Sequence, residues 1–138
     1  MSLRQVVDAP LSVEQHVAAV DDPRAGAVAT FVGRVRDHDP SVTGRVVALE
    51  YSAHPNAAAV LADVVGRVAG RPDVLAVAAS HRVGRLEVGE VAIVVTVATA
   101  HRALAFDVCR ELVETLKAEL PIWKREVLAD GSHVWVGM

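Results

Sequence analysis

Residues 99–128, TAHRALAFDVCRELVETLKAELPIWKREVL, contain the pattern that decides the fold. Pro121 must end any helix in this stretch because proline has no amide hydrogen to donate. Before it, apolar side chains recur every four residues and form one face of a helix: Leu104, Val108, Leu112 and Leu116. After it, residues 122–128 alternate as a strand does. We therefore predict a helix from residue 99 or 100 to Leu116, followed by a strand.

The remainder of the chain predicts two further helices. Ser12 and Gln15 have the spacing of a capping box, in which each side chain bonds a backbone amide at the helix start. That first helix should end near Pro23. Residues 55–69 carry apolar side chains at helical spacing and precede Gly70, which predicts the second helix and its end.

Strand-like runs separate these helices. They cover residues 26–35, 45–51, 74–83, 85–87, 90–99 and 134–136. We expect the first two runs to form a hairpin with a long polar loop at residues 36–44, and Gly33 to mark a bulge or a close backbone approach. The order of elements indicates an α+β fold with about three helices and a mixed or antiparallel sheet.

The bulk properties describe one globular domain spanning residues 1–138. Hydrophobic residues make up 52% of the chain and aromatic residues only 4%, so the core must consist mainly of valine, alanine and leucine. The net charge of −3 gives no general attraction to nucleic acid or to an anionic membrane. With no signal-like N-terminal pattern and no apolar run long enough to span a bilayer, we expect a cytoplasmic protein.

Several common kinds of site are missing from the sequence. It has no phosphate-binding glycine loop, dinucleotide fingerprint or nucleophile elbow. The histidines lack metal-ligand spacing, so we expect no metal and no other resident cofactor. The single cysteine, Cys109, excludes an internal disulfide and fits a reducing compartment. It lies next to the apolar face of the third helix, which indicates a packed small hydrophobe rather than a nucleophile.

Only two of the fourteen basic side chains are lysines, Lys117 and Lys124. Both fall where the third helix ends and the next strand begins. An ammonium group can exchange its proton, whereas guanidinium stays charged at ordinary pH, so this pair suggests proton-transfer chemistry. The alternative is a solvated helix end with cations in its last turn, where the helix dipole favours them.

His101 and Arg102 lie at the predicted start of the same helix. Free backbone amides and the helix dipole favour an anion there, such as a phosphate, although both side chains could simply face water. Lys117 follows His101 by sixteen residues, which corresponds to about 24 Å along the helix axis. One small ligand cannot reach both. They form either two separate sites or, as we favour, one site shared across a symmetric dimer.

Arg34 and Arg36 alternate along one face of the first predicted hairpin, near Phe31. Two guanidinium groups could clamp a phosphate or a carboxylate. Alternating arginines are also common on the wet face of a sheet, which is the simpler interpretation of this segment taken alone.

Four motifs, in this order, resemble the large catalytic subunit of molybdopterin synthase, the MoaE family. They are residues 26–38 (GAVATFVGRVRDH), residues 81–84 (HRVG) followed by Gly89 and Glu90, residues 99–106 (TAHRALAF) and residues 116–126 (LKAELPIWKRE). Together they span most of the chain. The combination of His-Arg at the helix start with the lysine motif at the helix end is specific.

The resemblance implies an α+β fold of the α/β-hammerhead type and a sulfurtransferase activity. In this family a small ubiquitin-like sulfur carrier (MoaD-like) binds at each end of a homodimer, which gives a heterotetramer. The carrier's C-terminal thiocarboxylate delivers sulfur to cyclic pyranopterin monophosphate and forms the dithiolene of molybdopterin. Such a site needs no sulfur nucleophile of its own.

The same resemblance implies roles for individual residues. Lys117 and Lys124 would be catalytic, since a lysine removed from water can act as a general acid or base. The substrate would be bound by Phe31, Arg34, Arg36, His101 and Arg102, with the last two supplied by the other subunit. The carrier's tail would lie against Lys117, Lys124, Trp123 and Arg125.

A second hypothesis is a non-enzymatic dimeric module that binds an anionic ligand or a ubiquitin-like tail. Such a module would tolerate Lys117→Arg because the charge is kept, whereas a proton-transfer role would not. A third hypothesis, nucleic-acid binding through the arginine-rich segment, is disfavoured because the net charge is negative and aromatic side chains are few.

Overall fold

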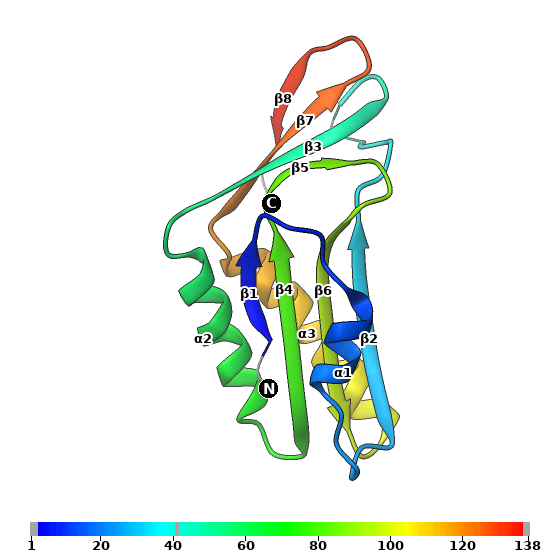
Figure 1. The fold of residues 1–138 in the computed structure, drawn as a ribbon, viewed down its shortest axis with the longest axis vertical. Helices are drawn as coiled ribbons and strands as arrows, with labels where there is room; N and C mark the ends of the chain where they lie inside the picture. Colours follow the sequence, from blue (N-terminus) through cyan, green and yellow to red (C-terminus); the bar gives the residue numbers. More distant parts are fainter. Residues whose placement is uncertain (1–2, 41, 137–138) are drawn as a thin grey trace.

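The strands of the computed structural model, which describes residues 3–40 and 42–136, form two four-stranded sheets (Figure 1). The elements follow the order β1 (Arg4–Val7), α1 (Val13–Ala19), β2 (Ala27–Arg34), β3 (Val46–Ala53), α2 (Ala57–Ala69), β4 (Val74–Arg82), β5 (Gly84–Glu87), β6 (Val91–Thr99), α3 (Arg102–Glu119), β7 (Ile122–Leu128) and β8 (His133–Val136). The predicted α+β class is confirmed.

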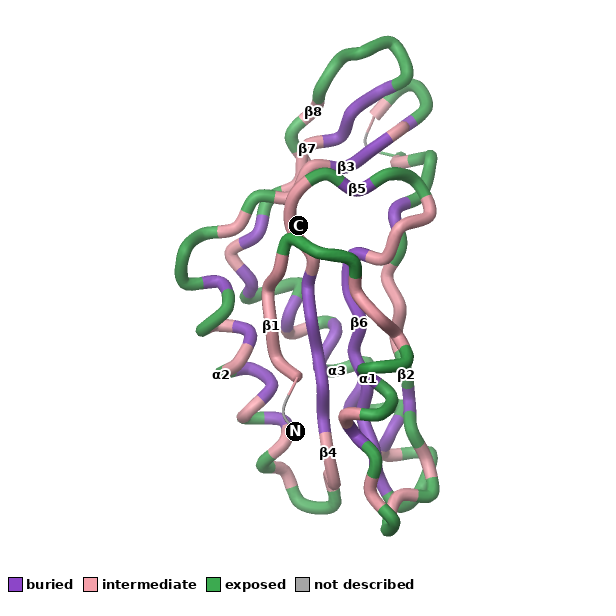
Figure 2. The backbone as a smooth tube through the Cα atoms, in the orientation of Figure 1, coloured by how far each residue is buried: buried purple, intermediate pink, exposed green. Residues whose placement is uncertain are grey.

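The larger sheet has the strand order β1-β4-β6-β2 and is mixed, because β1 runs parallel to β4 while the other pairs are antiparallel. Helices α2 and α3 pack on one of its faces and α1 on the other. Along β4, Val77 and Ala79 therefore belong to the main core, whereas Ala78 packs in the smaller core beneath α1. Covered on both faces, the two central strands are buried over most of their length (Figure 2).

The smaller sheet has the order β5-β3-β7-β8 and is antiparallel throughout. It lies beyond one end of the larger sheet (Figure 1). Its own apolar cluster joins the two sheets and contains Val35, Val46, Leu49, Leu86, Ala92 and Leu128. The chain passes between the sheets after β2, β3, β4 and β5 and again after α3, so the junction is lined by the ends of many elements.

The predicted hairpin of residues 26–35 and 45–51 is wrong. Strand β2 pairs with β6 in the larger sheet, and β3 pairs with β5 and β7 in the smaller one. The apolar run of β6 offers β2 a buried partner along its whole length, and the polar connection is long enough to cross between sheets. Neighbouring strands in sequence often pair, but burial decides which pairing prevails.

Strand β1 was not predicted from the sequence. Its four residues, RQVV, are half-buried and carry no clear alternation. It forms only because β4 supplies a parallel partner, in register from Arg4 opposite Ala79 to Val7 opposite Arg82. A short strand of this kind is specified by its partner rather than by its own pattern.

Local signals elsewhere agree with the structure. The Ser12 side chain accepts a hydrogen bond from the Gln15 amide at 3.2 Å and caps α1. The pairing of β2 with β6 shifts register between Gly33 and Arg34, as the predicted bulge required. Helix α3 buries the predicted residues Val108, Leu112 and Leu116, together with Ala105, Cys109 and Val113, while Leu104 is half-buried.

Helix α1 is fixed to the sheet by a buried histidine. The imidazole of His16 contacts the Ser12 carbonyl oxygen through Nδ1 at 2.6 Å and the Ser80 hydroxyl through Nε2 at 2.7 Å. The Thr96 hydroxyl donates to the His16 carbonyl oxygen at 2.8 Å. These contacts satisfy every polar atom of a side chain that is only 1% exposed, which gives His16 a structural role.

Candidate functional site

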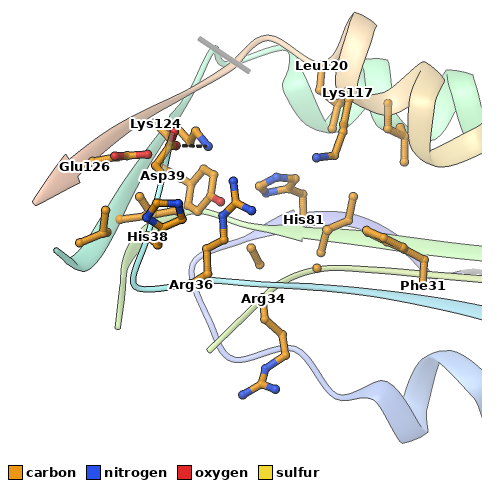
Figure 3. A pocket seen from close by; sticks show the side chains of 17 residues that line it. Phe31, Arg34, Arg36, His38, Asp39, His81, Lys117, Leu120, Lys124 and Glu126 are labelled. Carbon is orange, nitrogen blue, oxygen red and sulfur yellow. Dashed lines mark ion pairs between the residues drawn. The ribbon is translucent and has the colours of Figure 1, made fainter. Parts of the chain in front are cut away.

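A pocket of about 330 Å³ opens where the two sheets and the end of α3 meet (Figure 3). Its walls come from β2, β3, β4, β6, β7, the end of α3 and the segment after β2. The polar side chains that line it are Arg34, Arg36, His38, Asp39, Tyr51, His81, Lys117, Lys124 and Glu126. Phe31, Leu49, Ile93, Leu116 and Leu120 supply apolar walls.

Both lysines of the chain line this pocket, although they belong to different elements. Lys117 lies in the last turn of α3 and is exposed at the rim. Helix α3 ends because Leu120 takes an extended conformation before Pro121, and β7 then runs back along the pocket. Lys124 is half-buried on β7, with Nζ 3.8 Å from Asp39 Oδ2. The helix stop therefore brings the two ammonium groups to one cavity.

The substrate-binding residues predicted in and just after β2, Phe31, Arg34 and Arg36, differ in how their side chains face the pocket. Arg36 and Arg34 both line the pocket, but Figure 3 shows Arg36 pointing into it and Arg34 pointing away. The Arg34 Nε atom donates to the Gly89 carbonyl oxygen at 3.1 Å. Phe31 forms part of the wall. Of these three, Arg36 is the cation placed to meet a ligand.

His101 and Arg102 lie at the opposite end of α3 and do not line this pocket. His101 is the N-cap residue of the helix, with extended backbone and no capping hydrogen bond from its side chain. Both side chains are exposed. Within one chain, the two ends of α3 therefore remain separate, as their spacing in the sequence requires.

Trp123 and Arg125 flank Lys124 on β7 but do not line the pocket. Successive side chains of a strand point to opposite faces. Arg125 pairs with Glu50 and stacks over the Trp135 ring at 5.7 Å. Trp123 is 49% exposed. These two side chains form an outer surface of the smaller sheet next to the lysine site.

Glu126 was not predicted as a site residue. It is only 1% exposed, and its Oε2 atom has no hydrogen-bond partner among residues 3–40 and 42–136. Burial and the neighbouring Asp39 carboxyl raise the pKa of Glu126 to about 7, while Lys124 and Arg36 act in the opposite direction. Figure 3 shows its carboxyl group close to Asp39. The two-residue spacing from Lys124 is the sequence signal that places it on the same face.

His81 and Tyr51 line the pocket and were also not predicted as site residues, like His38 and Asp39. Their rings meet edge to face, with centroids 5.1 Å apart and planes at 74°. Burial lowers the pKa of His81, with a smaller contribution from Lys117. Burial also raises the pKa of Tyr51 to about 12, so its hydroxyl stays protonated. Only the HRVG motif marked His81, and no sequence signal marked Tyr51.

This arrangement suits a small anionic ligand. Lys117, Lys124 and Arg36 bring positive charge to a cavity of the size that small molecules occupy. The Tyr51 hydroxyl adds a neutral donor, and Glu126 adds a carboxyl group that titrates near neutral pH. No helix of the described segments is long and apolar enough to cross a membrane.

Comparisons with known proteins point to one family. The family model described as MoaE protein matches residues 6–119. Molybdopterin synthase catalytic subunit 1 of Mycobacterium tuberculosis is 40% identical over 134 residues, which cover 96% of this chain and 89% of that protein.

Solved structures agree with this result. A molybdopterin synthase structure from Staphylococcus aureus superposes with a TM-score of 0.89 at 28% identity, covering 100% of this chain and 99% of that one. A complex of subunits 1 and 2 of the molybdopterin-converting factor from Helicobacter pylori contains a chain with the same fold, at a TM-score of 0.75 and 17% identity. That match covers 96% of this chain and 88% of the other.

Proposed function

The chain belongs to the MoaE family of molybdopterin synthase catalytic subunits, and from this premise we propose that the pocket of Lys117 and Lys124 is where sulfur is transferred. As such a subunit, the chain takes sulfur from the thiocarboxylated C-terminus of a small carrier and adds it to cyclic pyranopterin monophosphate. The product is the dithiolene of molybdopterin. The observation that carries the proposal is that the two lysines of the chain line one cavity.

The charges of the pocket suit both reactants. Cyclic pyranopterin monophosphate carries a phosphate, and the carrier's tail ends in a thiocarboxylate, so both are anions. Arg36 points into the pocket and is the side chain of this subunit best placed to meet such a group (Figure 3). Guanidinium binds phosphate and carboxylate oxygens through paired hydrogen bonds.

The lysines supply the proton transfers. When the thiocarboxylate sulfur bonds to a substrate carbon, the substrate must gain or lose protons, and water later releases the carrier as a carboxylate. Lys117 is exposed at the rim in the free chain, so a bound carrier tail would cover it and remove it from water. Lys124, held near Asp39, stabilises the negative charge that develops.

The partners follow from the same premise. We propose that a MoaD-like carrier docks over the smaller sheet, where Trp123 is exposed and Arg125 lies against Trp135. His101 and Arg102 of a second copy would complete the substrate site, because within one chain they lie at the far end of α3. The assembly would then be a homodimer with a carrier at each end.

Reconstitution tests this function. The purified chain is mixed with a thiocarboxylated carrier and cyclic pyranopterin monophosphate, and molybdopterin is measured for wild type, Lys117→Arg and Lys124→Arg. We expect product from wild type and a loss of roughly 100-fold or more with Lys117→Arg, because guanidinium cannot exchange a proton at neutral pH. Arg67→Lys is the matched control. It exchanges an arginine for a lysine on the surface of α2, away from the pocket, and should keep full activity.

The outcome separates the enzyme from the binding module. If wild type binds the carrier but forms no molybdopterin, the non-enzymatic module replaces the sulfur-transfer site. If Lys117→Arg is as active as wild type, the chain is an enzyme in which Lys117 supplies charge and transfers no proton. The same reaction run with an unmodified carrier should give no product, since no sulfur is then available.

A further inference from the structure

His81 is a buried histidine that lies in the pocket but is assigned no part in the chemistry above. It belongs to β4, is 3% exposed, and faces the same side of the sheet as the core residues Val77 and Ala79. The other buried histidine, His16, has both ring nitrogens in contact with polar groups of the scaffold. His81 differs because its ring lines a cavity.

The backbone fixes the tautomer of His81. Its Nδ1 atom lies 2.7 Å from the Arg82 carbonyl oxygen. A carbonyl oxygen can only accept, so Nδ1 must carry the hydrogen. In the neutral ring, Nε2 is then an acceptor. The ring is also held in orientation by its edge-to-face contact with Tyr51.

The groups that face this ring are mostly cationic or neutral donors. Figure 3 shows the Lys117 amino group, from α3, pointing toward the imidazole. Arg36, His38 and Asp39 line the same pocket from the segment after β2. Tyr51 of β3 packs against the imidazole, and Lys124 and Glu126 of β7 line the same pocket. The Nε2 atom of the neutral His81 ring can accept a hydrogen bond from one of these donors, and the donor that points toward the ring is Lys117.

We propose that His81 is a positioning residue for Lys117, with its neutral imidazole accepting a hydrogen bond from the Lys117 amino group and holding that group over the reaction centre. The proposal rests on the proposed function, since it acts through Lys117. The arrangement parallels metal sites and catalytic triads, where a second side chain fixes the orientation of the reactive one. Below its own pKa His81 would become a cation, lose its acceptor and repel Lys117.

Substitution of His81 tests this role. The Asn side chain in His81→Asn can still donate to the Arg82 carbonyl oxygen but has no atom at the Nε2 position. It therefore removes the proposed acceptor, together with the ring contact to Tyr51. We expect kcat for molybdopterin formation to fall roughly 10- to 100-fold with little change in KM, because a small displacement of a catalytic group slows a reaction by this much. His16→Asn is the matched control. His16 is equally buried but lies on α1, at the other face of the sheet, where it contacts Ser80 of β4, so kcat of this variant should be unchanged.

The pH profile distinguishes positioning from a merely structural role. Burial lowers the pKa of His81 below the ordinary histidine value, so wild-type kcat should fall only as the pH drops through that lowered pKa. The same inflection should be missing in His81→Asn. A profile with the same inflection in both proteins, or a His81→Asn variant with wild-type kcat, would overturn the proposal while leaving sulfur transfer intact.

An independent readout does not require activity. In ¹⁵N spectra of the wild-type protein, the His81 ring should show a protonated Nδ1 and an unprotonated Nε2 at neutral pH, and Lys117→Met should move the Nε2 signal. A protonated Nε2, or an Nε2 signal insensitive to Lys117→Met, would refute the contact. Absence of product from the wild-type enzyme would instead contradict the proposed function, which the spectra do not test.

Discussion

Burial gives Glu126 an acid–base behaviour that its residue type alone would not have. An ordinary glutamate is ionised well below neutral pH, whereas Glu126 titrates near 7 because its carboxyl is removed from water beside Asp39. In the unfolded chain the pKa of Glu126 would return to its ordinary value of 4.5. The folded state therefore binds the Glu126 proton more tightly than the unfolded state does between pH 4.5 and about 7.

This difference predicts a pH-dependent stability. Below pH 4.5 both states are protonated, and as the pH rises to about 7 the unfolded state alone ionises, so stability decreases over that range. Glu126→Gln cannot ionise and should be more stable than wild type by about 3 kcal/mol at pH 8, with no difference at pH 4. Urea unfolding at the two pH values measures this directly.

Asp39→Asn provides the control for this prediction. It removes a carboxyl that raises the pKa of Glu126, so the decrease in stability between pH 4.5 and 7 should become smaller. A difference between wild type and Glu126→Gln that is the same at both pH values would show that folding leaves the pKa of Glu126 unchanged.

Taken from the residues alone, without the family resemblance, pocket residues were predictable where the sequence made them unusual. Lys117 and Lys124 stood out because the chain uses arginine everywhere else. Asp39, Tyr51 and His81 carried no comparable signal, since they come from three separate segments and meet Glu126 only in the folded chain. The chemistry of such residues depends on burial, which a single sequence does not reveal.

Among the elements, α3 and its stop at Pro121 organise the site. The apolar spacing of the helix and the proline were sufficient to predict both, and thus the approach of β7 to the end of α3. The partner strands were not predictable in the same way. Both β2 and β3 were recognised as strands, but their assignment to different sheets depends on β6 and β7, which lie far along the chain.

The start of α3 depends on Gly26, the residue that precedes β2. The Gly26 amide donates to the Thr99 carbonyl oxygen at 3.1 Å, and a Cβ atom at Gly26 would collide with the Ala100 carbonyl oxygen. Gly26→Ala must therefore displace the backbone that leads into His101. We expect a loss of about 1–3 kcal/mol in stability and weaker substrate binding, measured by thermal unfolding and by KM.

Gly66→Ala is the matched control for Gly26→Ala. It lies within α2, where an added Cβ meets only Arg4 Nη1 at an ordinary distance of 3.5 Å. Because alanine favours a helix over glycine, this variant should be as stable as wild type or more so. Equal stability for both variants would show that the contact between Gly26 and the segment leading into α3 is unimportant.

For the molecule as a whole, the two ends of α3 pose the central question. The pocket contains Lys117 and Lys124, while His101 and Arg102 lie at the opposite helix end and face solvent in the single chain. A symmetric dimer can bring the helix start of one copy to the pocket of the other. The distance along the helix already excluded one small ligand bound to both ends of α3 in the same chain. It left two alternatives, two separate sites or the shared site that we favour, and one chain by itself does not reveal the second copy.

Subunit complementation tests the shared site most directly. A Lys117→Ala chain and a doubly substituted His101→Ala, Arg102→Ala chain are co-expressed with different tags, and the mixed dimer is isolated and assayed for molybdopterin. One of its two pockets then combines an intact Lys117 with intact His101 and Arg102 from the other copy. We predict about half of the wild-type activity from this dimer, although each parent dimer is inactive. A mixed dimer as inactive as its parents would contradict a site completed by the second subunit.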